Sequence, residues 1–183
     1  TQIGTGGGLW ETMANGGTYR VRVRGKDSGV TSGGVWKPNT EAPGNPVDCN
    51  SVSPSLTNVR CVRVDKQAPA TVITNPVHIS DITSPVPSID GNATDAGSGV
   101  GKTFVAVCRD LAGAPDYNFC LDGLTGGAAF TAGPTWFERP AGASWSLNTN
   151  LVTAWAVGTF YHVLARSTDA VNNQEQYNAG AAN

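Results

Sequence analysis

Four aspartates lie in turns at the ends of alternating apolar and polar segments: Asp27, Asp65, Asp95 and Asp169. Carboxylate and carbonyl oxygens are the ligands that Ca²⁺ prefers in proteins. We therefore predict Asp65, Asp95 and either Asp27 or Asp169 as candidate calcium ligands that converge near module ends. The sequence contains no D-x-[DN]-x-[DN]-G loop. Because aspartates in turns often accept hydrogen bonds from their own backbone, a structural role is the alternative.

The stretch AGSGVGKT, residues 96–103, resembles a phosphate-binding loop in its closing Gly-Lys-Thr. Such a loop needs a buried strand before it and a helix after it, because loop amides and the helix N-terminus hold the anion together. Here two prolines interrupt the preceding segment, and TFVAVCRD after it has strand character without a helical period. We predict a tight turn between two strands, with Lys102 in solvent and no bound nucleotide.

Residues for nucleophilic catalysis are sparse. His78 and His162 lie far apart in the sequence, and no serine lies in a G-x-S-x-G elbow. Glu138, in TWFERP, is the one glutamate beside aromatic residues in an apolar run, so a carboxylate pair for glycoside hydrolysis has little support. We predict that the chain is not an enzyme.

Trp136 and Phe137 precede Glu138 directly. Aromatic side chains of this kind can stack against sugar rings, so we consider these two residues a candidate carbohydrate-binding patch. Packing in a core or an interface is the alternative, since large aromatic residues dominate the energetics of both.

Four cysteines form two pairs of equal spacing, Cys49 with Cys61 and Cys108 with Cys120. Zinc ligands usually occur as pairs about two to four residues apart, and no such pair is present. Strand-like flanks around a Pro/Gly turn in residues 108–120 predict a hairpin that brings its two cysteines together. We predict two local disulfides and an extracellular or cell-surface location; four buried free thiols are the alternative.

Charge and composition exclude several classes of partner. The formal net charge is −2, and the twelve Lys and Arg residues are not gathered into one run, so nothing predicts nucleic-acid binding. The chain has no apolar window of about 18 residues, so we predict no membrane span. It begins at Thr1 without Met or a leader, which we interpret as a mature or processed product. Asn92-Ala93-Thr94 is a sequon that fits an exposed loop of an exported chain.

Short strand-like segments follow one another through the second part of the chain, separated by turn signals such as SPVP, DAGSG and RPAG. The expected strands are 71–74, 88–94, 102–109, 117–121, 135–139, 144–148 and 159–167. Strands of this length without a convincing helical period predict an all-β sandwich of two sheets.

Two segments repeat each other without gaps: GGTYRVRVRGKD, residues 16–27, and GTFYHVLARSTD, residues 158–169. The aligned pairs include Gly16 with Gly158, Tyr19 with Tyr161, Val21 with Val163, Arg24 with Arg166 and Asp27 with Asp169. Each segment is a glycine turn, an alternating strand and an acidic turn. The recurrence predicts two related β modules, joined by VDKQAPAT at residues 64–71.

Three further segments carry a family resemblance: DKQAPAT, SIDGNATDAGSGVGKTFVAV and GTFYHVLARSTDAVNNQEQ. Together they resemble the bacterial Ig-like modules found in tandem on large secreted and cell-surface proteins. The resemblance covers residues 65–177 well and residues 15–28 more thinly. It implies an Ig-like β-sandwich that acts as a spacer, an adhesive or an assembly unit, usually without catalysis.

The chain departs from the family pattern in three places. Asn172-Asn173 stands where Gly-Asn is usual, and asparagine tolerates the left-handed conformation of that turn. Cys108 and Cys120 are additions to the pattern. The first module starts almost at its closing strand and then carries a Pro-rich excursion, residues 29–55, before a strand at 58–65.

We therefore expect a partial Ig-like module in residues 1–66 and a complete Ig-like β-sandwich in residues 67–183. A half-module would expose strand edges and an apolar face, which soluble monomers avoid. Either the chain is cut from a longer protein, or a neighbouring copy supplies the missing strands by β-augmentation. We expect a structural subunit or segment of an extracellular filament, sheath or adhesin; the alternative is a carbohydrate-binding accessory module.

Overall fold

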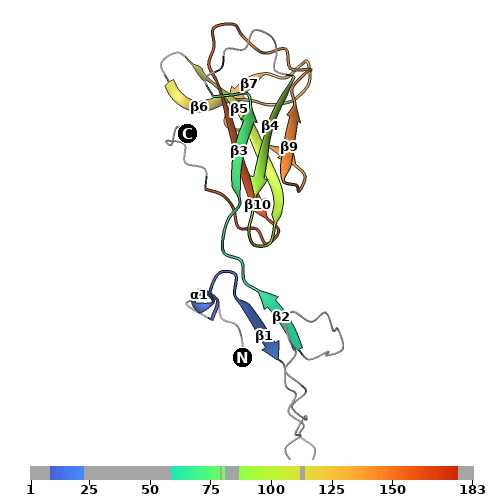
Figure 1. Ribbon diagram of the computed structural model, residues 1–183. Helices are drawn as coiled ribbons and strands as arrows, with labels where there is room; N and C mark the ends of the chain where they lie inside the picture. The colour runs from blue at the N-terminus through green and yellow to red at the C-terminus, as the bar shows by residue number, and fades with distance from the viewer. Residues whose placement is uncertain (1–8, 23–58, 79, 81–86, 112–113, 177–183) are drawn as a thin grey trace, which may run out of the picture. The chain divides into compact units, whose positions relative to one another are not determined.

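The computed structural model describes residues 9–22, 59–78, 80, 87–111 and 114–176 (Figure 1). The chain divides into two compact units, Thr1–Val64 and Asp65–Asn183. We call them unit 1 and unit 2. The boundary falls two residues before the one that the sequence predicts.

Unit 1 contains the short helix α1, Leu9–Thr12, and two antiparallel strands, β1 at Thr18–Arg22 and β2 at Val59–Arg63. Tyr19 lies opposite Val62, and Val21 lies opposite Arg60. Because side chains alternate between the two faces of a strand, Tyr19, Val21 and Val62 share one face. Val21 and Val62 are each 42% exposed, so among the described residues this apolar face is uncovered.

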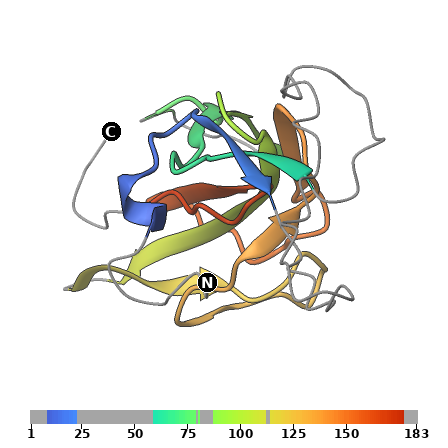
Figure 2. The same cartoon turned by 90° about the horizontal axis from the view of Figure 1, so that it is seen from below.

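Unit 2 contains eight described strands in two sheets. One sheet has the order β3-β4-β9, with bounds Ala70–Asn75, Ser88–Thr94 and Ser144–Asn148. The other has the order β10-β5-β6-β7, with bounds Tyr161–Asp169, Val100–Leu111, Ala114–Leu121 and Phe130–Ala132, and β8, Phe137–Arg139, also pairs with β5. In Figure 2, β10 (red) lies beside β5 (yellow-green). The all-β prediction is confirmed, apart from α1.

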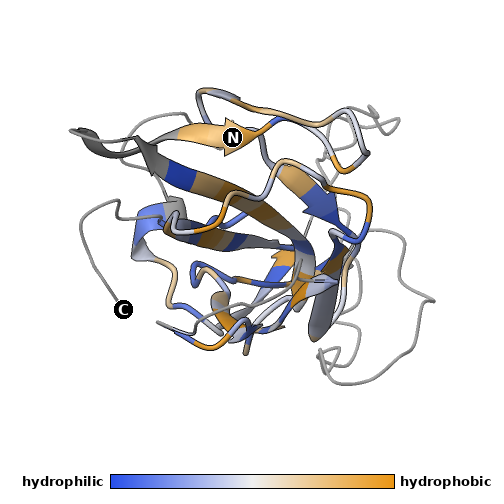
Figure 3. Ribbon diagram, turned by 90° about the horizontal axis from the view of Figure 1, so that it is seen from above, coloured by the Kyte–Doolittle hydropathy of each residue, from blue (hydrophilic) through white to orange (hydrophobic). Residues whose placement is uncertain are grey.

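The main core of unit 2 lies between these sheets. Ile89 and Leu147 come from the β3-β4-β9 sheet, whereas Val107 and Leu121 come from the other, and all four are 0–1% exposed. Apolar (orange) and polar (blue) residues both occur along the strands (Figure 3). Exposed and buried residues alternate along β9, which is the period of two that buries one face of a strand. This packing of residues from two sheets is consistent with a β-sandwich.

A second, smaller cluster lies on the other face of the β10-β5-β6-β7 sheet. Its buried residues are Ala106, Cys108, Cys120 and Leu164, and Trp136 packs against them. Leu164 of β10 belongs to this second cluster and is therefore only 7% exposed, although it faces away from the main core.

The predicted repeat has the same local geometry in both units. Gly16 and Gly158 both have φ of 74°, a left-handed conformation that glycine adopts at little cost. The Tyr19 hydroxyl accepts a hydrogen bond from the Ala14 amide at 2.6 Å, and the Tyr161 hydroxyl accepts one from the Ala156 amide at the same distance. β1 and β10 are therefore structural counterparts.

The turn at residues 95–99 joins β4 directly to β5, which begins at Val100 within AGSGVGKT, so the stretch is a turn between two strands, as predicted. The Lys102 ammonium lies 2.9 Å from the Glu138 carboxylate, and both side chains are 53% exposed. The sequence missed β7 entirely, because three residues between glycine-rich stretches carry too little pattern.

Candidate functional site

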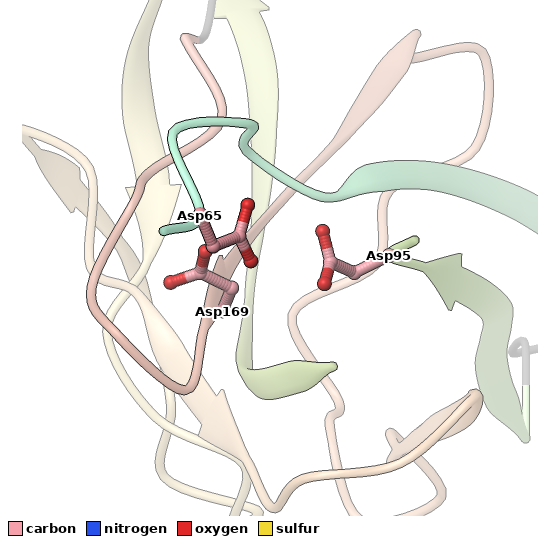
Figure 4. Close-up of side chains that lie close together, drawn as sticks. All are labelled: Asp65, Asp95 and Asp169. Atoms are coloured by element: carbon pink, nitrogen blue, oxygen red, sulfur yellow. The ribbon is translucent and has the colours of Figure 1, made fainter. Parts of the chain in front are cut away.

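Three aspartates predicted as metal ligands converge at one end of unit 2. Asp65 precedes β3, Asp95 follows β4, and Asp169 ends β10. One carboxylate oxygen of each lies within 4.8 Å of one from each of the others. Figure 4 shows Asp65 and Asp169 close together, with Asp95 facing them. Asp27 lies outside the described residues.

Asp169 is 2% exposed and holds the turn that follows β10. Its Oδ1 accepts hydrogen bonds from the amides of Val171 and Asn173, at 3.0 and 2.7 Å. Its Oδ2 accepts one from Asn173 Nδ2 at 2.6 Å. Asn172 within this turn has φ of 70°, the left-handed conformation that the sequence predicted for it.

Asp65 is 5% exposed and connects three segments of unit 2. Its carboxylate accepts hydrogen bonds from the Gln67 amide and from the Ser98 amide. Its backbone carbonyl accepts one from Asn173 Nδ2 at 3.0 Å. Asn173, which the sequence did not single out, therefore links the entry of the chain to the turn after β10.

Gly97 allows Asp65 to approach the turn after β4. A Cβ at position 97 would lie 2.0 Å from Asp65 Oδ2 and 2.4 Å from Oδ1. Glycine is thus required by space, and the AGSG sequence that suggested a phosphate loop in fact accommodates a carboxylate.

Asp95 differs from the other two because one of its oxygens is unused. Its Oδ2 accepts hydrogen bonds from the amides of Gly97 and Gly99, at 2.9 and 2.7 Å. Its Oδ1 is buried and has no hydrogen-bond partner among the described residues. Oxygens bound to one Ca²⁺ at about 2.3–2.6 Å lie no more than about 5 Å apart, so the spacing of the cluster suits a calcium ion. A carboxylate oxygen that accepts an N–H retains a second lone pair for a cation.

The structure separates the two aromatic residues of the predicted sugar patch. Trp136 packs on the second cluster, whereas Phe137 packs against the main core. The Arg166 guanidinium carbon lies 4.3 Å from the centroid of the Trp136 ring and 5.9 Å from that of Phe104. The two rings lie in clusters on opposite faces of the β10-β5-β6-β7 sheet, so they form no common platform.

The disulfide between Cys108 and Cys120 is confirmed. The two residues lie directly opposite each other on β5 and β6, with an S–S distance of 2.04 Å. Cys61 is also disulfide-bonded, and its predicted partner Cys49 lies outside the described residues. Asn92 of the sequon is exposed in the middle strand β4, rather than in a loop.

No protein-family model matches the chain, and comparisons with curated proteins and with solved structures gave no significant match. In the part of the chain that the structure describes, no helix is long and apolar enough to cross a membrane.

Proposed function

We propose that the chain is a structural segment of an extracellular filament, sheath or cell-surface adhesin, built from Ig-like modules that strands from neighbours complete. The observation that carries this proposal is the β1-β2 hairpin, whose apolar face leaves Val21 and Val62 each 42% exposed. In unit 2, Val163, the counterpart of Val21, packs against the main core. An isolated two-stranded hairpin is marginally stable in water, so unit 1 gains stability from added strands.

Two features of unit 2 support an Ig-like module. Its two sheets contribute residues to one core. The Tyr161 hydroxyl accepts a hydrogen bond from the Ala156 amide five residues upstream, a contact similar to the one that the tyrosine corner of Ig-like sandwiches makes with the backbone.

The disulfide between Cys108 and Cys120 supports the extracellular location, since disulfides persist mainly in oxidising compartments. The role is non-enzymatic in this proposal.

Electron microscopy of untreated material, with light scattering alongside, tests the proposed function. Long regular fibres are expected, with a repeat that corresponds to one or two modules. A solution that contains only monodisperse particles near 18.9 kDa would contradict strand complementation between copies.

A second candidate function is calcium binding by Asp65, Asp95 and Asp169, and the buried unpartnered Oδ1 of Asp95 favours it. Extracellular calcium modules bind with Kd values of about 10⁻⁴–10⁻³ M. A ligand at about 100 times its Kd stabilises the folded state by about 2.7 kcal/mol. Ca²⁺ at about 10 mM, which is about 10–100 times such a Kd, is therefore expected to raise Tm by several degrees relative to EDTA.

Two variants make the calcium test specific. Asp95→Asn removes one charge of the cluster and should abolish the calcium-dependent rise in Tm. Asp122→Asn changes an exposed aspartate outside the cluster that accepts a hydrogen bond from the Ala129 amide, and it should retain the rise. An unchanged Tm of the unaltered chain in Ca²⁺ would contradict calcium binding and would leave the three carboxylates only the role of accepting hydrogen bonds that hold the turns.

A further inference from the structure

One edge of strand β10 corresponds to the edge of its counterpart β1 that pairs with β2. β1 pairs with β2, the strand that follows it, and the pairing continues past the strand end: the Gly16 amide donates to the Val64 carbonyl at 2.8 Å, and the Val64 amide donates to the Gly17 carbonyl at 2.9 Å. Among the described residues, the amide of Gly158 and the carbonyl of Thr159, which correspond to these two groups, have no backbone partner.

The chain after β10 shows which edge of β10 has no partner strand among the described residues. β10 pairs along its length with β5, which precedes it in the sequence. After Asp169 the chain turns back along the opposite edge, where Thr168 forms a bridge with Gln174 and the Glu175 amide donates to the Ser167 carbonyl at 3.0 Å. These are the backbone contacts that the described residues make on this edge. In both units the chain that follows the strand returns along this edge: β2 pairs with β1, and Gln174 pairs with Thr168 of β10.

Exposed apolar side chains lie at the start of this edge. Val157 is fully exposed, and Phe160 is 78% exposed. The counterpart of Phe160 is Thr18, which lies directly opposite Arg63 in unit 1. A strand that occupies the β10 edge in the same register would therefore place an arginine against the Phe160 ring, which allows a cation–π contact.

The sheet that β2 would join at the β10 edge is larger and better packed than the two-stranded ribbon that it forms with β1. Beside β1 it belongs to a two-stranded ribbon whose Val62 is 42% exposed. Beside β10 it would join a sheet whose strands cover the main core. Sheets of three or more strands over a hydrophobic face are stable where isolated hairpins are marginal, so exchange of the partner strand is favourable.

We propose that β2 of one copy adds to the open edge of β10 in a second copy, antiparallel and in the register that β2 has with β1. Tyr161 then lies opposite Val62, His162 opposite Cys61, and Val163 opposite Arg60. This inference rests on the proposed function and names its donor strand and acceptor edge. Each copy carries one donor and one acceptor, so the contact is head-to-tail and can continue from copy to copy.

Disulfide trapping tests the register. The probe is a synthetic peptide of residues 57–65 whose Cys61 carries a 2-thiopyridyl mixed disulfide, and the protein is the full chain with His162→Cys, whose thiolate attacks the Cys61 sulfur and releases 2-thiopyridone. Directly opposite residues on antiparallel strands lie close enough for a disulfide, as Cys108 and Cys120 do in this protein. The matched control is Thr168→Cys, which lies on the same face of β10 beyond the reach of the peptide.

We expect at least about tenfold more peptide adduct with His162→Cys than with Thr168→Cys, because only the former lies opposite Cys61 in the register. Mass spectrometry of the adducts, with peptide mapping to locate the disulfide, gives the yields. Equal yields, or equal yields with a peptide of scrambled sequence, would overturn the proposal.

A second measurement covers the case that His162→Cys fails to fold. A fluorescent peptide with Cys61→Ser should bind the unaltered chain with a rise in anisotropy and should slow fibre growth, whereas its scrambled form should do neither. Absence of binding by this peptide would also overturn the proposal. Fibres without peptide binding would contradict β2 and β10 as donor and acceptor and would still support the proposed filament. Peptide binding without fibres would reject the filament and retain the open edge.

Discussion

Asp65 and Gly97 depend on each other. The Asp65 carboxylate is buried against the turn that contains Gly97, and hydrogen bonds from Gln67 and Ser98 hold it there. It has no room to retreat from a new methyl group, since a Cβ at position 97 would lie 2.0 Å from Oδ2.

Gly97→Ala should therefore destabilise unit 2 by about 1–3 kcal/mol, the usual cost of overpacking a well-packed site. Urea unfolding followed by tryptophan fluorescence measures the change. Gly127→Ala is the matched control, because a Cβ there meets nothing within 4 Å, and its unfolding midpoint should stay at that of the unaltered chain. An unchanged midpoint in Gly97→Ala would show that the turn or Asp65 moves freely.

Asp90 makes stability depend on pH. Hydrogen bonds from Ser146, Ser88 and Asn75 lower the pKa of Asp90 below its ordinary value of 3.8, against the opposing effect of burial. The folded state therefore binds fewer protons than the unfolded state in this range, so stability rises with pH. The contribution of Asp90 is present above about pH 4 and is lost as the pH falls through the lowered pKa.

Asp90→Asn should remove that part of the pH dependence. The free energy of unfolding, measured in urea at pH 5 and again at about pH 3, should fall less in the variant than in the unaltered chain. An equal fall in both proteins would mean that Asp90 ionises alike in the folded and unfolded states.

The three-aspartate cluster shows what residue types alone predict. Acidic turn residues at strand ends predicted Asp65, Asp95 and either Asp27 or Asp169 as candidate ligands, and the structure brings the first two together with Asp169. The contribution of Asn173 was missed, since only the meeting of the chain entry with the turn after β10 gives its amide two partners. The sequon at Asn92 was expected in a loop, but it lies in β4.

At the scale of strands, the repeat is the most informative signal. The alignment of residues 16–27 with 158–169 predicted two equivalent strands, and the shared tyrosine hydrogen bonds and glycine φ values match this. The prediction that Trp136 and Phe137 form one patch was wrong, because Trp136 packs on the second cluster and Phe137 against the main core. β7 was not predictable, since three residues are too few to show a strand pattern and only the pairing with β6 in the folded sheet defines them as a strand.

The repeated tyrosines allow a matched pair of variants. Tyr161→Phe removes the hydroxyl that accepts from the Ala156 amide and should destabilise unit 2 by about 0.5–1.5 kcal/mol, the net value of one hydrogen bond. Tyr19→Phe removes the same contact in unit 1. The main cooperative unfolding transition should shift in Tyr161→Phe and stay in place in Tyr19→Phe.

Hydrogen exchange resolves the two effects further. Amides of β10 should lose protection in Tyr161→Phe, and amides of β1 should lose it in Tyr19→Phe. Loss of protection at both strands in either variant would show that the two hydrogen bonds act as one unit.

At the scale of the whole molecule, the two units differ in what they bury. Every residue of the two described hydrophobic clusters belongs to Asp65–Asn183. In unit 1, Val64 is the one described apolar side chain that is fully buried. The sequence predicted this imbalance from the missing front half of the first module.

A chain restricted to residues 65–183 should therefore fold on its own. Its Tm should differ from that of the full chain by no more than the few degrees that correspond to about 1 kcal/mol in a domain of this size. Differential scanning calorimetry of the truncated and full chains makes the comparison. The truncated chain lacks β2, so it should remain monomeric at concentrations where the full chain forms fibres. A large loss of Tm would show that unit 1 contributes to the core of unit 2.

The buried position of Asp65 bears on how unit 2 responds to mechanical tension. A pull on the chain that enters unit 2 first meets Asp65, whose carboxylate is bonded to the turn after β4 and whose carbonyl is bonded to Asn173 beyond β10. The load thus spreads to both sheets before it reaches the backbone pairing of β3. Rupture then requires several hydrogen bonds to break together, so the entry of unit 2 should resist force better than an ordinary terminal strand that unzips one bond at a time.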